Sequence, residues 1–294
     1  MFSFCSAPQS LTNWDWFSCY LTTNVHMSFY IAILKVLLLL ALTAPAALAF
    51  GFLGATAARS ARSPVRWIGK AYIAIVRGIP DIVFFLFFVI ALDQIIEYAR
   101  HRILCPDWSE PVRQGNEFIV CQAAKMPPNA AAEWLHQVYG FGLAIFTFAI
   151  VFGAFAANIL FGAMRSVAAG QVEAATAYAM TRRQTFWRVV VPQMWVYALP
   201  GLSNLWMGLI KATPLLFLLG VQDIVYWARE LGGIKTPQFT AYPHGDWRMW
   251  YFLALLALYL IFTKVSEIVF DRLQQRLNRG QATSGGMARL RAAT

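Results

Sequence analysis

The sequence predicts an all-helical membrane protein with about five transmembrane helices. Of its 294 residues, 59% are hydrophobic and only 13% are charged, and the mean hydropathy is +0.54. Soluble domains are about half apolar and a quarter charged, so this composition indicates several membrane spans. The formal net charge of +10 falls mostly between the apolar runs, as topology signals do, so we expect no nucleic-acid partner.

The first expected span covers 28–56, which exceeds the roughly 20 residues that a helix needs to cross the hydrocarbon core. Its one charge, Lys35, lies near the N-terminal end, where the side chain can reach the interface. A short basic loop follows and is expected in the cytoplasm, which makes 1–27 an external segment. This loop contains Arg59, Arg62, Arg66 and Lys70.

Four further spans are expected along a permeation domain covering 28–270. The second run, 82–92, is too short to cross alone, so it must recruit flanking residues that place Arg77 and Asp81 at the inner membrane edge. The remaining spans cover about 138–164, 194–221 and 247–264. Between and after them we expect an external loop at 98–137, a cytoplasmic loop at 165–193 and a basic cytoplasmic tail at 271–294.

The distribution of basic residues predicts the orientation of the chain. The expected inner segments hold 14 Lys and Arg residues and the expected outer segments hold 7. Cytoplasmic loops are enriched in these residues. We therefore expect the N-terminus outside and the C-terminus in the cytoplasm.

This topology places all four cysteines, Cys5, Cys19, Cys105 and Cys121, on the external side. An even set of cysteines in an oxidising compartment is compatible with disulfides, and four unpaired thiols are an equal alternative. Sequence alone does not give connectivity, but Cys105 with Cys121 is the pairing we favour for one bridge.

The sequence shows no motif for hydrolytic, metal or nucleotide chemistry. It has no HExxH, no GxSxG and no phosphate-binding loop, and its four histidines are isolated. We therefore expect no enzymatic activity, no metal and no cofactor in this chain. A partner must supply the energy for any active process.

The most distinctive interval is 170–201, a basic, helix-forming block between two apolar segments. We expect two short helices joined by a basic turn, with Glu173 in the first turn of the first helix, where backbone N–H groups favour an anion. Phe186, Val189 and Val190 would form an apolar stripe on the second. An interfacial amphipathic helix, with Trp187 and the arginines at lipid headgroups, is an open alternative.

Several motifs make the chain resemble the permeases of ABC importers, in particular the polar amino acid uptake class of the histidine/octopine type. The resemblance covers about 28–280. Glu173-Ala174-Ala175, with Pro192 and Leu199-Pro200, resembles the EAA loop. Further matching signatures are Arg77-Gly78-Ile79-Pro80-Asp81, Ser203-Asn204-Leu205, Lys211-Ala212-Thr213-Pro214-Leu215-Leu216 and Gly220-Val221-Gln222-Asp223.

The resemblance implies a type I ABC permease fold in a bacterial inner membrane. Such permeases pair, as homo- or heterodimers, with two cytoplasmic ATPase subunits that bind the ATP, and with an external solute-binding protein. The EAA loop docks on the ATPase. Ala179 stands where the family usually has glycine, so we expect a stiffer, more continuous junction between the two helices. The implied coupling residues are Gly170, Gln171, Glu173, Ala174, Ala175 and Ala179.

The implied mechanism is alternating access, in which closure of the ATPases rocks the spans. The solute would be histidine, an arginine-like cation or an opine. Each candidate pathway residue also has a purely structural explanation, such as mutual neutralisation of Arg77 and Asp81. A secondary transporter and a membrane-embedded enzyme are competing classes. We expect buried polar groups to line the pathway, namely Arg77, Asp81, Asn158, Asn204, Lys211 and Asp223.

Overall fold

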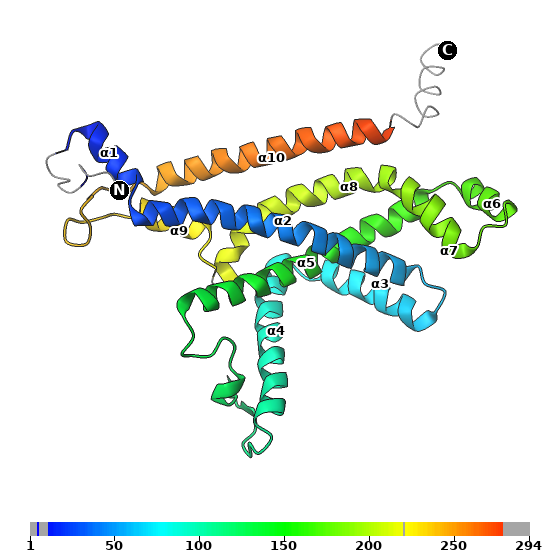
Figure 1. Ribbon diagram of the computed structural model, residues 1–294, viewed down its shortest axis with the longest axis horizontal. Coiled ribbons are helices and arrows are strands. Elements are labelled where there is room, and N and C mark those ends of the chain that lie inside the picture. The colour runs from blue at the N-terminus through cyan, green and yellow to red at the C-terminus, as the bar shows by residue number, and fades with distance from the viewer. Residues whose placement is uncertain (1–4, 6–10, 220, 279–294) are drawn as a thin grey trace, which may run out of the picture. The chain divides into compact units, whose positions relative to one another are not determined.

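The computed structural model describes residues 5, 11–219 and 221–278, and the described chain is predominantly helical, as expected (Figure 1). The chain divides into two compact units. Unit 1 combines 1–47, 78–151 and 211–258, and unit 2 combines 48–77, 152–210 and 259–294. Four of the five divisions fall inside helices α2, α5, α8 and α10, so each of these helices contributes residues to both units. The fifth falls before Gly78, at the end of the helix over 63–78.

Four described helices are long and apolar enough to cross a membrane, and they coincide with four of the five expected spans. They are α2 Asn24–Ala58, α4 Asp81–Leu104, α5 Glu133–Ser166 and α10 Arg248–Asn278. The expected span at 194–221 is divided between α8 Val191–Ala212 and the 3-10 helix η5 Thr213–Leu219. Pro214 has no N–H with which to continue the α-helical ladder, which accounts for the change at this point.

Some segments expected as loops are helical instead. The expected basic loop after α2 is wrong beyond residue 62, because α3 occupies Ser63–Gly78. α9 Ile224–Gly232 lies between the expected fourth and fifth spans, and α10 runs into the expected tail. Hydropathy marks the apolar part of a helix, whereas polar helix-forming residues continue the ladder beyond it.

In unit 1, the segment before the first span is folded against the start of α10. α1 Asn13–Leu21 is tied to Cys5 by a disulfide from Cys19. The Tyr20 hydroxyl lies 2.9 Å from His244 Nε2 and accepts a hydrogen bond of 3.2 Å from the Tyr251 hydroxyl. Burial raises the pKa of Tyr20, so its hydroxyl keeps its proton at neutral pH. The buried cluster around these contacts consists of Cys5, Cys19, Tyr20 and Tyr242, with Leu11, Trp16 and Trp247 packed against it.

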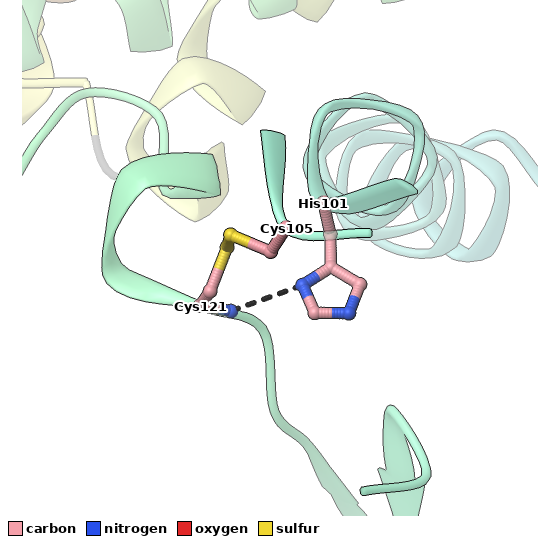
Figure 2. A group of neighbouring side chains, drawn as sticks. All are labelled: His101, Cys105 and Cys121. Atoms are coloured by element: carbon pink, nitrogen blue, oxygen red, sulfur yellow. Dashed lines mark hydrogen bonds between the residues drawn. A yellow bond between two sulfur atoms is a disulfide. The ribbon is translucent and has the colours of Figure 1, made fainter. Parts of the chain in front are cut away.

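A second disulfide joins Cys105, just after α4, to Cys121 (Figure 2). This is the pairing favoured from the sequence, and all four cysteines are in bridges, so the alternative of unpaired thiols is wrong. Between them lies a short antiparallel hairpin of β1 Arg113–Gln114 and β2 Glu117–Phe118. The bridge therefore closes a loop of its own at the C-terminal end of α4, seen in Figure 1.

Unit 2 is held together by close packing of small residues between α2 and α5. A Cβ atom added at Gly51 would lie 2.6 Å from Cβ of Ala156, and one added at Gly54 would lie 3.0 Å from Cβ of Ala157. Small residues allow such approach between membrane helices. The adjoining buried cluster comprises Ala55, Leu160, Ala163, Met164, Val167, Val190, Met194 and Ala198.

Candidate functional site

The expected coupling block begins with α6 Ala169–Ala177, whose C-terminal end is closed by a Schellman motif. The Ala179 N–H donates to the Thr176 carbonyl at 2.9 Å, and the Met180 N–H donates to the Ala175 carbonyl at 3.1 Å. This pattern requires the left-handed conformation at Ala179, which has φ 55°. The expectation of a more continuous junction is therefore wrong: the helix ends, although alanine occupies the position that glycine favours.

The second helix starts with a capping box immediately after this turn. α7 Arg182–Thr185 has Thr181 as its N-cap. The Gln184 N–H donates to Thr181 Oγ1 at 3.3 Å, and the Thr181 N–H donates to Gln184 Oε1 at 2.8 Å. These two bonds satisfy N–H groups that a helix start leaves without partners.

The second helix is not short, because α7 continues through a π-helical turn, η4 Phe186–Val190, into α8. The Val191 N–H bonds to the Phe186 carbonyl, a separation of five residues. Pro192 follows directly and cannot donate a backbone N–H, so the irregular turn lies next to the residue that interrupts the ladder. Of the expected stripe, Val190 is buried and Phe186 packs against the core cluster.

The predicted docking residues do not all lie at the surface of α6. Gly170, Gln171, Glu173 and Ala174 are exposed, but Ala175 is only 4% exposed. Ala175 therefore supports the helix from beneath and is not part of an accessible face. Glu173 lies in the middle of α6, so its expected place in the first turn is also wrong. The exposed residues remain the predicted docking surface.

Gln171 connects α6 to the spanning part of the chain. The Gln193 side chain at the start of α8 donates from Nε2 to Gln171 Oε1 at 3.4 Å. Val172, on the inner side of α6, packs against the core cluster of unit 2. Figure 1 shows α6 and α7 side by side as a hairpin.

The six pathway candidates differ in burial from what we expected. Asp223 alone is buried, at 0% exposure, and it caps α9 by accepting the Tyr226 N–H on Oδ1 at 2.9 Å. Its Oδ2 has no hydrogen-bond partner in the described part of the chain, and burial raises its pKa to about 6. The other five are exposed in the single chain: Arg77, Asp81, Asn158, Asn204 and Lys211.

A cavity of about 470 Å³ in unit 1 brings together polar residues that the sequence interpretation did not select. Lys35 from α2 lines it together with Glu133 and His136 from the start of α5. Neither Lys35 nor Glu133 takes part in an ion pair within the described chain. Lys35, the single charge of its apolar run, was a usable signal; no motif marks Glu133 or His136. The remaining lining residues are Leu38, Trp134, Gln137, Val138, Gly140, Phe141, Val221 and Gln222.

One group in unit 1 has the composition of a metal site. Ligand atoms of His101, Cys105 and Cys121 all lie within 4.8 Å of one another. Figure 2 shows the two sulfurs bonded to each other and His101 Nδ1 accepting the Cys121 N–H, at 3.1 Å. Cysteine binds metals as the thiolate, so in this oxidised form the group is a structural bridge.

Comparison with known proteins shows the family to which this chain belongs. The family described as "Binding-protein-dependent transport system inner membrane component" matches residues 47–279. The chain belongs to this family. It is therefore a multi-pass permease component of the inner membrane, and the matched region includes the whole α6–α7 hairpin. Members of this family are membrane subunits of transport complexes that also contain ATP-binding and solute-binding partners.

Several curated relatives of this permease are similar over most of their length. The histidine/lysine/arginine/ornithine transport system permease protein HisQ of Salmonella typhimurium is 31% identical over 235 residues, covering 80% of this chain and 86% of HisQ. The arginine ABC transporter permease protein ArtQ of Escherichia coli is 28% identical over 216 residues, covering 74% and 80%. The octopine transport system permease protein OccQ of Rhizobium radiobacter is 28% identical over 233 residues, covering 79% and 83%.

The fold is also found in a solved structure. The protein described as "Crystal structure of an amino acid ABC transporter with histidines" superposes with a TM-score of 0.57 at 19% identity. The match covers 85% of this chain and 95% of that chain. This likeness establishes the type I ABC permease fold for the chain.

Proposed function

We propose that this permease carries polar amino acids or opines inward as the non-catalytic half of an ATP-driven importer. The observation that carries the proposal is the α6–α7 hairpin, which holds Glu173 and Ala174 exposed on a helix whose C-terminal end is fixed by the turn into α7. The names of its relatives, which carry arginine, histidine or octopine, support the solute class. In this proposal ATP binds to a separate cytoplasmic subunit pair.

The importer would contain two permease subunits, either identical or different, and an external solute-binding protein. The predicted topology supports this arrangement, because it places the hairpin in the cytoplasm and the disulfide-bridged loops outside. Alternating access would couple the two sides: movement of α6 with the ATPase is transmitted through the continuous helix from α7 into α8. The chain itself would bind no cofactor.

The cavity lined by Lys35 and Glu133 is our candidate for part of the solute path. A free amino acid carries a carboxylate and an ammonium group, and in a membrane-embedded site both need partners of opposite sign. Lys35 offers the cation and Glu133 the anion. Trp134 and Phe141 offer apolar surface for the side chain of the solute.

The coupling role is tested by Glu173→Lys in the assembled transporter. This charge reversal on the exposed face of α6 should abolish solute uptake and solute-stimulated ATP hydrolysis, while membrane insertion and yield stay at wild-type levels. Glu117→Lys, a charge reversal at a residue that is also exposed, on β2 of unit 1, is the matched control and should retain uptake. Unchanged transport by the Glu173 variant would refute the coupling role.

A pull-down distinguishes the importer from the competing classes. Tagged chain extracted in mild detergent should bring down an ATP-binding subunit. Solute transport by the purified chain alone in liposomes, with no such subunit present, would instead establish a secondary transporter.

A further inference from the structure

Unit 2 contains a cavity of about 680 Å³ between the C-terminal end of α2 and the inner side of the α6–α7 hairpin. Its α6 lining residues are Val172 and Thr176, which lie on the other side of the helix from Ala174. Thr176 is also the i+3 neighbour of Glu173, so the cavity opens beside one edge of the predicted docking face. The transport mechanism proposed above does not use it. Its lining consists of Thr56, Arg59, Ala61, Val172, Thr176, Met180, Arg182, Thr185, Phe186 and Val190.

The charge in this cavity is entirely positive. Arg59 and Arg182 both line it, and no acidic residue does. Within the described residues neither arginine takes part in an ion pair, and both are exposed. Two guanidinium groups with free donors match the oxygens of a phosphate group, which they can bind bidentately.

The remaining polar groups and the apolar lining define the rest of the ligand. Thr56 and Thr176 donate their hydroxyl protons to backbone carbonyls of Phe52 and Val172, at 2.8 and 2.9 Å. The two arginines are the charged donors of the cavity. Phe186 and Val190 provide an apolar wall continuous with the core cluster, so the cavity suits an anionic head attached to an apolar body.

We propose that this cavity binds the phosphate headgroup of an anionic phospholipid of the cytoplasmic leaflet. The predicted topology places the arginines at that membrane surface, where anionic lipids attract basic residues. Trp187, 51% exposed and 5.7 Å from the Phe52 ring between centroids, offers an interfacial anchor next to the cavity. The lipid braces the side of α6 opposite Ala174.

The test measures lipid binding by the purified full-length chain with native mass spectrometry after titration with phosphatidylglycerol or phosphatidylcholine. We expect selective retention of phosphatidylglycerol. The double variant Arg59→Gln/Arg182→Gln should weaken it by roughly 10- to 30-fold, because each arginine near an anionic surface contributes about fivefold. The matched control is Arg183→Gln/Arg188→Gln, which removes two exposed arginines of the same helix that do not line the cavity and should retain binding.

Equal loss of phosphatidylglycerol in both double variants would overturn the proposal, because it would indicate attraction to the overall basic surface. Inorganic phosphate and glycerol 3-phosphate are the probes for a soluble ligand. Competition by either one at micromolar concentration would assign the cavity to free phosphate and overturn the lipid assignment. Circular dichroism of each variant verifies its fold, and since no solute or ATP is used, the outcome is independent of the proposed transport.

Discussion

Replacing Ala179 by glycine should stabilise the turn between α6 and α7. Ala179 has φ 55°, a left-handed conformation that costs a residue with a Cβ atom about 1–2 kcal/mol. Glycine avoids this cost but loses about 0.4–1 kcal/mol more conformational entropy on folding. The difference leaves a net stabilisation of about 0.5–1 kcal/mol, with both Schellman hydrogen bonds retained.

Hydrogen exchange followed by mass spectrometry measures this effect at the turn itself. Exchange of the Met180 amide, which bonds to the Ala175 carbonyl, should slow by about two- to fivefold, since local opening reports local stability. The matched control is Ala177→Gly, two residues earlier in the last helical turn of α6. There glycine should have the opposite effect and destabilise the helix end by about 0.5–1 kcal/mol.

Opposite signs at two alanines so close in sequence test the geometry directly. Faster exchange in Ala179→Gly, or equal responses of the two variants, would refute the left-handed turn. Ala179→Val adds a further test, because a β-branched residue is a genuine outlier at positive φ and should loosen the turn.

Three other substitutions test the packing, the buried acid and the solute cavity. Gly51→Ala places a Cβ atom 2.6 Å from that of Ala156 and should cost about 1–3 kcal/mol in thermal unfolding; Gly162→Ala, with nothing within 4 Å, should be neutral or stabilising. Burial raises the pKa of Asp223 from 3.8 to about 6, so the folded chain binds the proton of this carboxyl more tightly than the unfolded chain does. The free energy of unfolding therefore falls as the pH rises from about 4 to about 6, by ~3 kcal/mol at most. Asp223→Asn keeps an N-cap, so its melting temperature should exceed that of the wild type at pH 7.5 but not at pH 4. If the two proteins differed in melting temperature by the same amount at both pH values, this prediction would be contradicted. Lys35→Met should lower uptake by about tenfold, because it removes one hydrogen bond between a charged group and the solute. Uptake equal to that of the wild type would exclude this cavity from the solute path.

The spanning helices could be predicted because their signals are local. Residues 28–56 form an apolar run that lies within α2, and the helix extends a few residues beyond the run at each end. The ends of helices and the polar helices are harder to predict. α3 follows the turn after α2 and has a basic, amphipathic sequence that is equally compatible with a loop. Hydropathy detects burial in lipid, whereas a polar helix depends on capping and packing.

The candidate site was located by its motif, but its surface could not be read from sequence. Whether an alanine of α6 is buried depends on which side packs against the core cluster, and only the tertiary fold decides this for Ala175. The capping box at Thr181 and Gln184 was visible in the sequence as Thr-x-x-Gln, a signal that the interpretation did not use. Hydropathy places Lys211 within an expected span but does not show which side of that span packs against the rest of the chain, and in the structure Lys211 is exposed.

The hydrogen bonds of the hairpin explain how a short exposed helix can transmit movement. Four successive N–H groups, from Tyr178 to Thr181, are all bonded, three to carbonyls of α6 and the fourth to the Gln184 side chain. No unbonded amide remains in the turn to serve as a hinge. Since α7 then continues through the π-helical turn into α8, whose Met194 is fully buried in the core cluster, a displacement of α6 must shift α8 or break these bonds. If the proposed function holds, the strained left-handed backbone at Ala179 accompanies this rigid turn. Replacing Ala179 by glycine should remove the strain and leave the transmission of movement from α6 to α8 intact.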